Sequence, residues 1–326
     1  MHFPEVVATA SPTVSPTADA ASLSAKSFPE TTARPSWERI RFGGWILAAL
    51  VVLLYWPIVQ KLVTDWWDDP NYSHGFLVPV FSGYLVWRSR AHLAALTPRG
   101  SWAAGLLVLL LGLGFLILGE VGAERFLAAS SLVVVLAGLV LLHLGPAVGR
   151  RLAFPLAYLL FAIPLPTIVF YAIAFPLQQL AATNAAWTLD LLGVPVLLDG
   201  NVIHLSHVTL GVTEACSGIR SLVSMLALAV AWGALSFGSA WMTTVLAASA
   251  VPITIVANAG RVVATGLIGQ YVGMEYATGF FHTLSGWVIF LVAFTGLLCV
   301  HALLRYLPVR GIASAREGGV LKGRRQ

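Results

Sequence analysis

Apolar segments of roughly 20 residues recur along the 326-residue chain, and they limit its possible folds more than any other feature. A helix of about 20 apolar residues is long enough to cross the roughly 30 Å hydrocarbon layer of a membrane. Hydrophobic residues make up 58% of the chain and charged residues 10%, whereas soluble proteins carry about 25% charged residues. These apolar residues are too many for one soluble core, and segments that cross lipid are expected to be helices. The chain is therefore predicted to be an all-α polytopic membrane protein.

About eight segments are expected to cross the membrane, and together they form a predicted membrane domain over residues 42–306. The second segment, 75–87, is short, and the fifth, 152–171, is interrupted by Pro164 and Pro166. The other expected spans are 43–63, 102–119, 126–144, 217–235, 241–268 and 282–306.

The charged residues predict which way the chain is oriented in the membrane. Basic residues flank one side of the expected spans and acidic residues mark the other, so the basic side is predicted to be cytoplasmic. All but four of the 19 Lys and Arg residues fall on that side, which places both termini in the cytoplasm. The net charge of +5 is thus explained by topology, and no nucleic-acid partner is expected.

Two terminal tails frame the membrane domain. Residues 1–41 are rich in Ser, Thr, Ala and Pro and contain no apolar run, so a disordered cytoplasmic tail is expected there. Residues 307–326 are expected to form a basic cytoplasmic tail.

The segment between the fifth and sixth spans is less apolar. Residues 172–192 include Gln, Asn and Asp and are predicted to form an interfacial helix on the outer face of the membrane rather than another crossing. Residues 194–213 are predicted to form a short extracytoplasmic β-hairpin, because Asp199-Gly200-Asn201 lies between two runs of β-forming residues.

Three reactive side chains are expected at one depth, near the outer surface: Cys216, Arg261 and His282. A cysteine at a helix N-terminus or beside a cation has a lowered thiol pKa and is a stronger candidate nucleophile. Histidine exchanges protons near neutral pH, and an arginine within an apolar span is a candidate for a functional role. Each also has a plainer interpretation: a small buried residue, an interfacial histidine, and an arginine that pairs with Glu214 or Glu275.

Four further residues are expected to bind substrate or to support these three: Arg220, Asn258, Glu214 and His74. Arg220 follows Cys216 by four residues and could serve the thiolate, clamp substrate or pair with Glu214. The second cysteine, Cys299, lies deep in the last apolar run and is expected in the core. Two cysteines are too few for a structural zinc site, so neither a metal nor another cofactor is expected.

Several sequence pieces together resemble the exosortase/archaeosortase family, and specifically the bacterial exosortases. They are Asn71-Tyr72-Ser73-His74-Gly75-Phe76, Glu214-Ala215-Cys216-Ser217-Gly218-Ile219-Arg220, Ala257-Asn258-Ala259-Gly260-Arg261 and His282. The resemblance covers residues 40–305 and implies an integral-membrane cysteine protease/transpeptidase with a triad of Cys216, Arg261 and His282.

The resemblance also implies substrates, location and partners. The implied substrates are exported proteins with a C-terminal sorting signal of the PEP type, formed by a Pro-Glu-Pro motif, a transmembrane helix and a basic end. Such systems accompany exopolysaccharide production in Gram-negative bacteria, which implies the inner membrane, contact with its lipids and an active site that faces the periplasm. Because the printed chain ends soon after the last span, a separate accessory protein is expected to replace the C-terminal domain that some relatives carry.

Two other function classes are left open by the residues. A non-enzymatic component of polysaccharide export that binds a lipid-linked glycan through its polar groups would tolerate Cys216→Ser but not changes to Trp66, Trp67 or the basic loops. A small-molecule transporter is disfavoured because the polar residues gather near one face of the membrane rather than at the midplane.

Overall fold

The computed structural model describes residues 37–212, 218–277 and 280–306, with the side chains of 37–43, 274, 277 and 280–283 excepted. The helices are α1 (Trp37–Asp68), η1 (Ser73–Phe76), α2 (Leu77–Arg88), α3 (Arg90–Ala95), α4 (Trp102–Val121), α5 (Arg125–His143), α6 (Pro146–Tyr158), η2 (Leu159–Ala162), α7 (Thr167–Leu191), α8 (Ile219–Ser236), α9 (Ala240–Tyr271), α10 (Met274–Ala277) and α11 (Phe280–Tyr306). The strands are β1 (Val196–Asp199), β2 (Val202–Leu205) and β3 (Thr209–Gly211).

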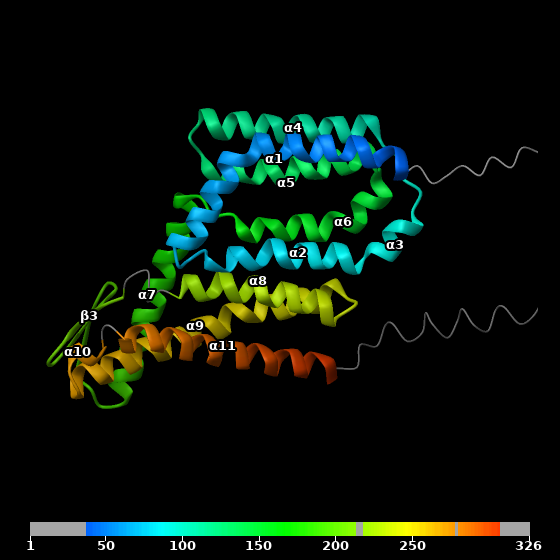
Figure 1. Cartoon of the computed structure of the whole chain (residues 1–326). Helices are drawn as coiled ribbons and strands as arrows, with labels where there is room; N and C mark the ends of the chain where they lie inside the picture. The colour runs from blue at the N-terminus through cyan, green and yellow to red at the C-terminus, as the bar shows by residue number, and fades with distance from the viewer. Residues whose placement is uncertain (1–36, 213–217, 278–279, 307–326) are drawn as a thin grey trace, which may run out of the picture.

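The helices form a bundle of the predicted class. Within the described residues, six helices are long and apolar enough to cross a membrane: α1, α4, α5, α8, α9 and α11. A seventh span results if α6–η2 and α7 count as one bent segment. The short α2, at 12 residues, is only about 18 Å long, yet α2 and α6 lie lengthwise within the bundle (Figure 1). The all-α polytopic membrane fold is therefore confirmed. Each expected span overlaps a described helix, but six or seven segments, not eight, meet the length and composition needed to cross a membrane.

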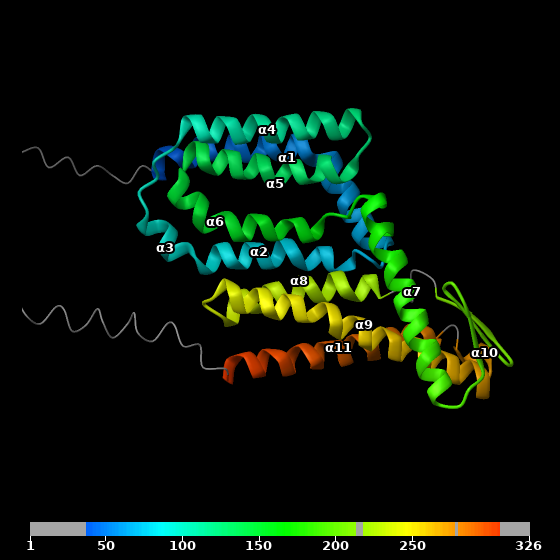
Figure 2. The same cartoon turned by 180° about the vertical axis from the view of Figure 1, so that it is seen from behind.

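The bundle has two distinct ends. The start of α1 and the end of α11 lie at one end, called here the terminal end (Figures 1 and 2). The three strands, α10 and the oblique α7 lie at the other, called the sheet end. The tail predicted over 1–41 is wrong for residues 37–41, which already belong to α1. The rest of that tail and residues 307–326 lie outside the described residues.

The fifth expected span is divided where its two prolines occur. The segment α6–η2 ends at Ala162, and α7 begins at Thr167, directly after Pro166, with a bend of 75° between them. Proline lacks a backbone N–H and disfavours helical geometry in the residue before it, so Pro164 and Pro166 interrupt the helix. The interfacial helix expected at 172–192 thus starts five residues earlier, and its placement on the membrane surface stays a prediction.

The predicted β-hairpin is confirmed and extended. Strands β1 and β2 pair antiparallel with Asp199 opposite Val202, and Gly200 has a φ of +60° at the first of the two turn positions. Type II′ hairpin turns favour glycine at that position. A third strand, β3, which was not expected, pairs antiparallel with β2.

The sheet anchors the chain immediately before the Cys216 region. Its inner side chains pack against α7 and α9 in one cluster that includes Leu189, Ile203, Val212 and Val262. Val212 is 1% exposed and is the last described residue before 213–217. On the other side, Ile219 is also 1% exposed and packs against Phe170 and Ala174 of α7. The residues that flank 213–217 are therefore held in two separate buried clusters.

Cys299 does not lie in the core. The packed face of α11 is formed by Ala293, Leu297 and Leu304, whereas Cys299 is exposed. Residues two apart on a helix point in different directions, so Leu297 can be buried while Cys299 faces outward. The expectation of a buried Cys299 was wrong because hydropathy alone does not say which face of a helix is packed.

Candidate active site

The beginning of α8 lies against the sheet-end half of α9. Gly218 precedes α8 with a φ of +81°, and a Cβ placed on it would lie 3.0 Å from Cγ of Asn258. Glycine adopts this left-handed conformation without a steric penalty, and a larger residue would also press on the amide. Asn258 is 2% exposed. The chain two residues after Cys216 therefore packs directly on the buried Asn258.

Arg261 connects α9 to α11. It lies one helical turn after Asn258, is half-buried, and its Nε donates a hydrogen bond of 3.2 Å to Oγ of Ser285. Ser285 follows His282 by three residues in α11, and residues three apart share a helix face. Arg261 therefore contacts the beginning of α11, the helix to which position 282 belongs.

His74 is held between two other parts of the bundle. Its Nε2–H donates to the carbonyl oxygen of Phe161 at 3.1 Å, because a carbonyl can only accept. In the neutral ring Nδ1 then accepts from the hydroxyl of Ser224 on α8, at 3.4 Å. Burial is the main influence on the ring and lowers the pKa of His74 below its usual 6.5, against a smaller opposing effect of backbone hydrogen bonds.

The lowered pKa of His74 predicts a loss of stability in mild acid. The folded protein holds His74 neutral, while the unfolded chain takes up a proton near pH 6.5. This contribution is thus fully present above that pH and is lost as the pH falls toward the folded-state pKa. We expect the thermal midpoint of the purified protein to fall more between pH 7 and pH 5 than that of His74→Gln. Equal pH dependence of the two proteins would contradict this assignment.

The motif around His74 is fitted to a buried tryptophan. Trp66 is buried, and its Nε1 donates a hydrogen bond of 2.7 Å to the carbonyl oxygen of Ala162. A Cβ on Gly75 would overlap the Trp66 indole ring, so only glycine fits at that position. Gly75 therefore lets η1 approach α1 closely and sets the position of His74.

Arg220 has a partner that sequence reasoning did not consider. Its Nε donates a hydrogen bond of 3.2 Å to Oδ1 of Asn71, the first residue of the same motif. The start of α8 is thereby joined to the loop after α1. The expected pairing of Arg220 with Glu214 falls outside the described residues.

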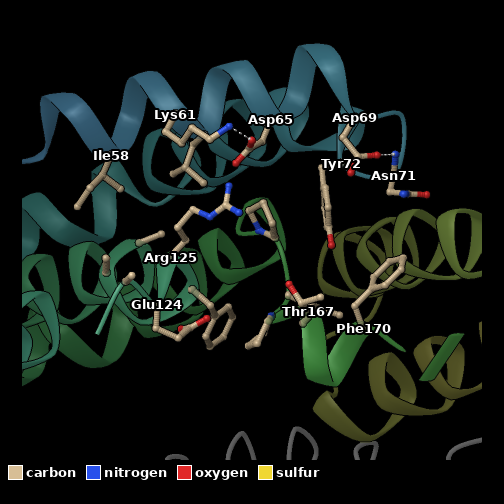
Figure 3. Close-up of a pocket in the computed structure, with 18 of the residues that line it drawn as sticks. Ile58, Lys61, Asp65, Asp69, Asn71, Tyr72, Glu124, Arg125, Thr167 and Phe170 are labelled. Atoms are coloured by element: carbon tan, nitrogen blue, oxygen red, sulfur yellow. Dashed lines mark hydrogen bonds and ion pairs between the residues drawn. The ribbon is translucent and has the colours of Figure 1, made fainter. Parts of the chain in front are cut away.

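A pocket of about 470 Å³ opens beside this region at the sheet end (Figure 3). It is bounded by the end of α1, the α4–α5 turn, and the proline-containing link from η2 to α7. Its lining includes the side chains of Asp65, Asn71, Tyr72, Arg125 and Phe170. Asn71 and Phe170 therefore belong both to the pocket and to the contacts that hold Arg220 and Ile219.

The structure describes some of the predicted site residues and not others. Asn258, Arg261, Arg220 and His74 all lie at the sheet end, within the network just described. Cys216 and Glu214 lie outside the described residues, and His282 is placed only as part of α11.

Sequence reasoning missed Asn71 as a partner, Ser224 and Ser285 in this network, and Lys61 and Arg125 in the lining of the pocket. A signal existed for the last two, because Lys61 and Arg125 are basic residues on the side of the membrane where basic residues are rare.

The fold and the site define a multi-pass membrane protein in which four polar candidate residues, His74, Arg220, Asn258 and Arg261, lie at one end of the helix bundle. Residues 66–299, well over half of the chain, match the family described as transmembrane exosortase (Exosortase_EpsH), and the chain belongs to this family. Family membership supports a role as a membrane sorting transpeptidase. A comparison with curated proteins and one with solved structures each gave no match.

Proposed function

We propose that the protein is a cysteine protease/transpeptidase that cleaves C-terminal PEP-type sorting signals of exported proteins. In this proposal the exported part of the substrate is held as a thioester on Cys216 after cleavage. It is then transferred to water or to a surface acceptor, and the process is linked to exopolysaccharide export. The observation that carries the proposal is the family match over 66–299, which includes Cys216, Arg261 and His282.

The contacts between helices support a shared site for these three residues. Gly218, two residues after Cys216, packs on Asn258, and Asn258 precedes Arg261 by one turn. Arg261 in turn binds Ser285, one turn after His282. Two described contacts thus link α8, α9 and α11 beside the three proposed residues, which are far apart in sequence.

The chemistry assigned to each residue follows from its side chain. The Cys216 thiolate attacks the carbonyl carbon at the sorting motif, and the tetrahedral oxyanion forms next to the guanidinium of Arg261. His282 protonates the leaving amine, the C–N bond breaks, and the acyl group remains on sulfur. His282 then takes a proton from the acceptor, which attacks the thioester and releases the thiolate.

The direct test is mass spectrometry of a signal-bearing reporter protein coexpressed with the enzyme. We expect a new C-terminus within the sorting motif, either free or carrying an added group. An unchanged reporter in the presence of well-expressed enzyme would contradict the proposal.

We also propose that the sheet end faces the periplasm and that both termini lie in the cytoplasm of a bacterial inner membrane. The bias of basic residues toward the terminal end motivates this orientation.

A membrane-impermeant maleimide added to intact spheroplasts is expected to label Cys216 in a Cys299→Ser background. It is not expected to label Cys299 in Cys216→Ala, because Cys299 lies within a lipid-crossing stretch of α11. Labelling of Cys216 only after the membrane has been permeabilised would reverse the orientation.

The site gives little support to the alternative function, in which the protein binds a lipid-linked glycan without catalysis. That alternative assigned glycan binding partly to Trp66, but the Trp66 ring is buried and its N–H is bound to Ala162. Trp67 is exposed and remains available, so tolerance of Cys216→Ser is the observation that would favour this alternative.

A further inference from the structure

The four basic residues that break the charge bias all gather at the sheet end. They are Lys61, Arg125, Arg220 and Arg261, whereas Arg88, Arg99, Arg150 and Arg305 lie toward the terminal end. Lys61 and Arg125 line the 470 Å³ pocket, and Arg220 binds its wall residue Asn71. In the pocket lining Lys61 and Arg125 are accompanied by four acidic residues, Asp65, Asp69, Glu120 and Glu124, so binding of an anionic ligand depends on a cation that these carboxylates do not occupy.

Most charges in the pocket are already engaged. Lys61 forms an ion pair of 2.6 Å with Asp65. Asp69 accepts a hydrogen bond from the Asn71 backbone, and Glu124 accepts one from the Leu127 backbone at the start of α5. Glu120 is exposed at the end of α4.

Arg125 is different. It makes no hydrogen bond or ion pair with any residue the structure describes, and its guanidinium points into the pocket toward α1 (Figure 3). A guanidinium presents two parallel N–H groups that match the two oxygens of a carboxylate. Of the two cations that line the pocket, Arg125 is therefore the one left to bind a ligand carboxylate, because Lys61 is paired with Asp65.

The walls suit an extended peptide. The side chains of Tyr72, Phe170, Tyr171, Pro164 and Pro166 contribute flat apolar surfaces to the lining. Aromatic-lined grooves bind extended, proline-containing segments, whose stiff backbone loses little entropy on binding. The pocket volume falls within the range of about 300–1,000 Å³ typical of small-ligand sites, so it can hold a few residues and not a folded partner.

The pocket leads directly to the start of α8. Phe170 packs against Ile219 and Asn71 binds Arg220, which follow Cys216 by three and four residues. A segment bound in the pocket would therefore continue toward the proposed nucleophile. A lipid phosphate could also bind Arg125, but this continuity with α8 favours the peptide.

We propose that this pocket binds the carboxylate-bearing part of the sorting signal, with Arg125 as the residue that recognises the carboxylate. The proposal rests on the function proposed above and adds a specificity-determining residue to it. Arg220 was expected above as a possible substrate clamp, but it already has a side-chain partner in the structure.

A double-mutant cycle between enzyme and substrate tests the proposal. The full-length enzyme in proteoliposomes is given a reporter whose sorting motif carries either Glu or Gln, and kcat/KM is measured. We expect Arg125→Gln to lower kcat/KM for the Glu reporter by about tenfold to a hundredfold, the range for hydrogen bonds to charged groups. For the Gln reporter, the same substitution should change kcat/KM less than about threefold, because the partner carboxylate is already gone.

Two further variants keep the test interpretable. Arg125→Lys retains the positive charge but loses the two parallel N–H donors of the guanidinium. It is therefore expected to discriminate between the Glu and Gln reporters better than Arg125→Gln but less well than the wild type. Arg151→Gln removes an exposed cation from α6, outside the pocket lining, and is expected to match the wild type.

The outcomes separate the two proposals. Equal losses on both reporters in Arg125→Gln would overturn the role of Arg125, as would a loss that disappears when anionic lipids are omitted from the vesicles, which would indicate a lipid headgroup instead. If the wild type fails to process the Glu reporter in a Cys216-dependent way, the proposed function itself fails, and this inference fails with it.

Discussion

Replacing Cys216 by alanine is expected to abolish processing of a signal-bearing reporter, with a loss of at least about a thousandfold in kcat. Covalent catalysis depends on the nucleophile, and residues that act as a unit lose nearly all activity when one is removed. Cys216→Ser should be almost as inactive, because a hydroxyl at its ordinary pKa is a much weaker nucleophile than a thiolate. The measurement is the fraction of reporter with the processed mass after coexpression with each variant.

The second cysteine provides a matched control for this experiment. Cys299 is exposed on α11, outside the network at the sheet end, so Cys299→Ser should process the reporter like the wild type. Each variant should be extracted in similar yield and with a similar thermal midpoint. Full processing by a well-folded Cys216→Ala protein would exclude the cysteine mechanism, and full processing by Cys216→Ser would support the glycan-binding alternative.

The lengthwise helices were predictable because lipid imposes a length and a composition on them. The expected spans 102–119 and 126–144 differ from α4 and α5 by no more than two residues at either end. The prolines also predicted the break near 164–166. Hydropathy could not predict that α1 would begin at Trp37 or that a third strand would join the hairpin, because these depend on local helix formation and on pairing between strands.

The position of four candidate residues along the bundle was predictable, but their contacts were not. Alternation of the spans placed Asn258, Arg261, Arg220 and His74 on the same side of the membrane, and the structure puts all four at the sheet end. The alternation of spans could not predict that Arg220 would bind Asn71, or that Ser224 would approach His74, because the residues of each pair are separated by about 150 positions in the sequence. Which side chains meet across helices is set by packing, and a single sequence does not encode packing in a readable pattern.

Arg261→Lys is expected to lower kcat by about a hundredfold to a thousandfold, the effect of removing one donor from an oxyanion site. Lysine keeps the positive charge but loses the planar fork, and its single ammonium cannot donate to Ser285 and face an oxyanion in the same geometry. Because the interaction is proposed to form with the transition state, KM should change little while kcat falls. The measurement is steady-state kinetics on the reporter, with the thermal midpoint recorded in parallel.

Ser285→Ala distinguishes a catalytic Arg261 from a structural one. Loss of the 3.2 Å bond from Nε leaves the guanidinium in place but less well oriented, so kcat should fall by about tenfold, the usual effect of one hydrogen bond. In the Arg261→Lys background the same change should add almost nothing, since its partner is already altered. If instead Arg261→Lys lowers the thermal midpoint strongly and leaves kcat of the folded fraction unchanged, Arg261 holds α9 against α11 and does not act on the substrate.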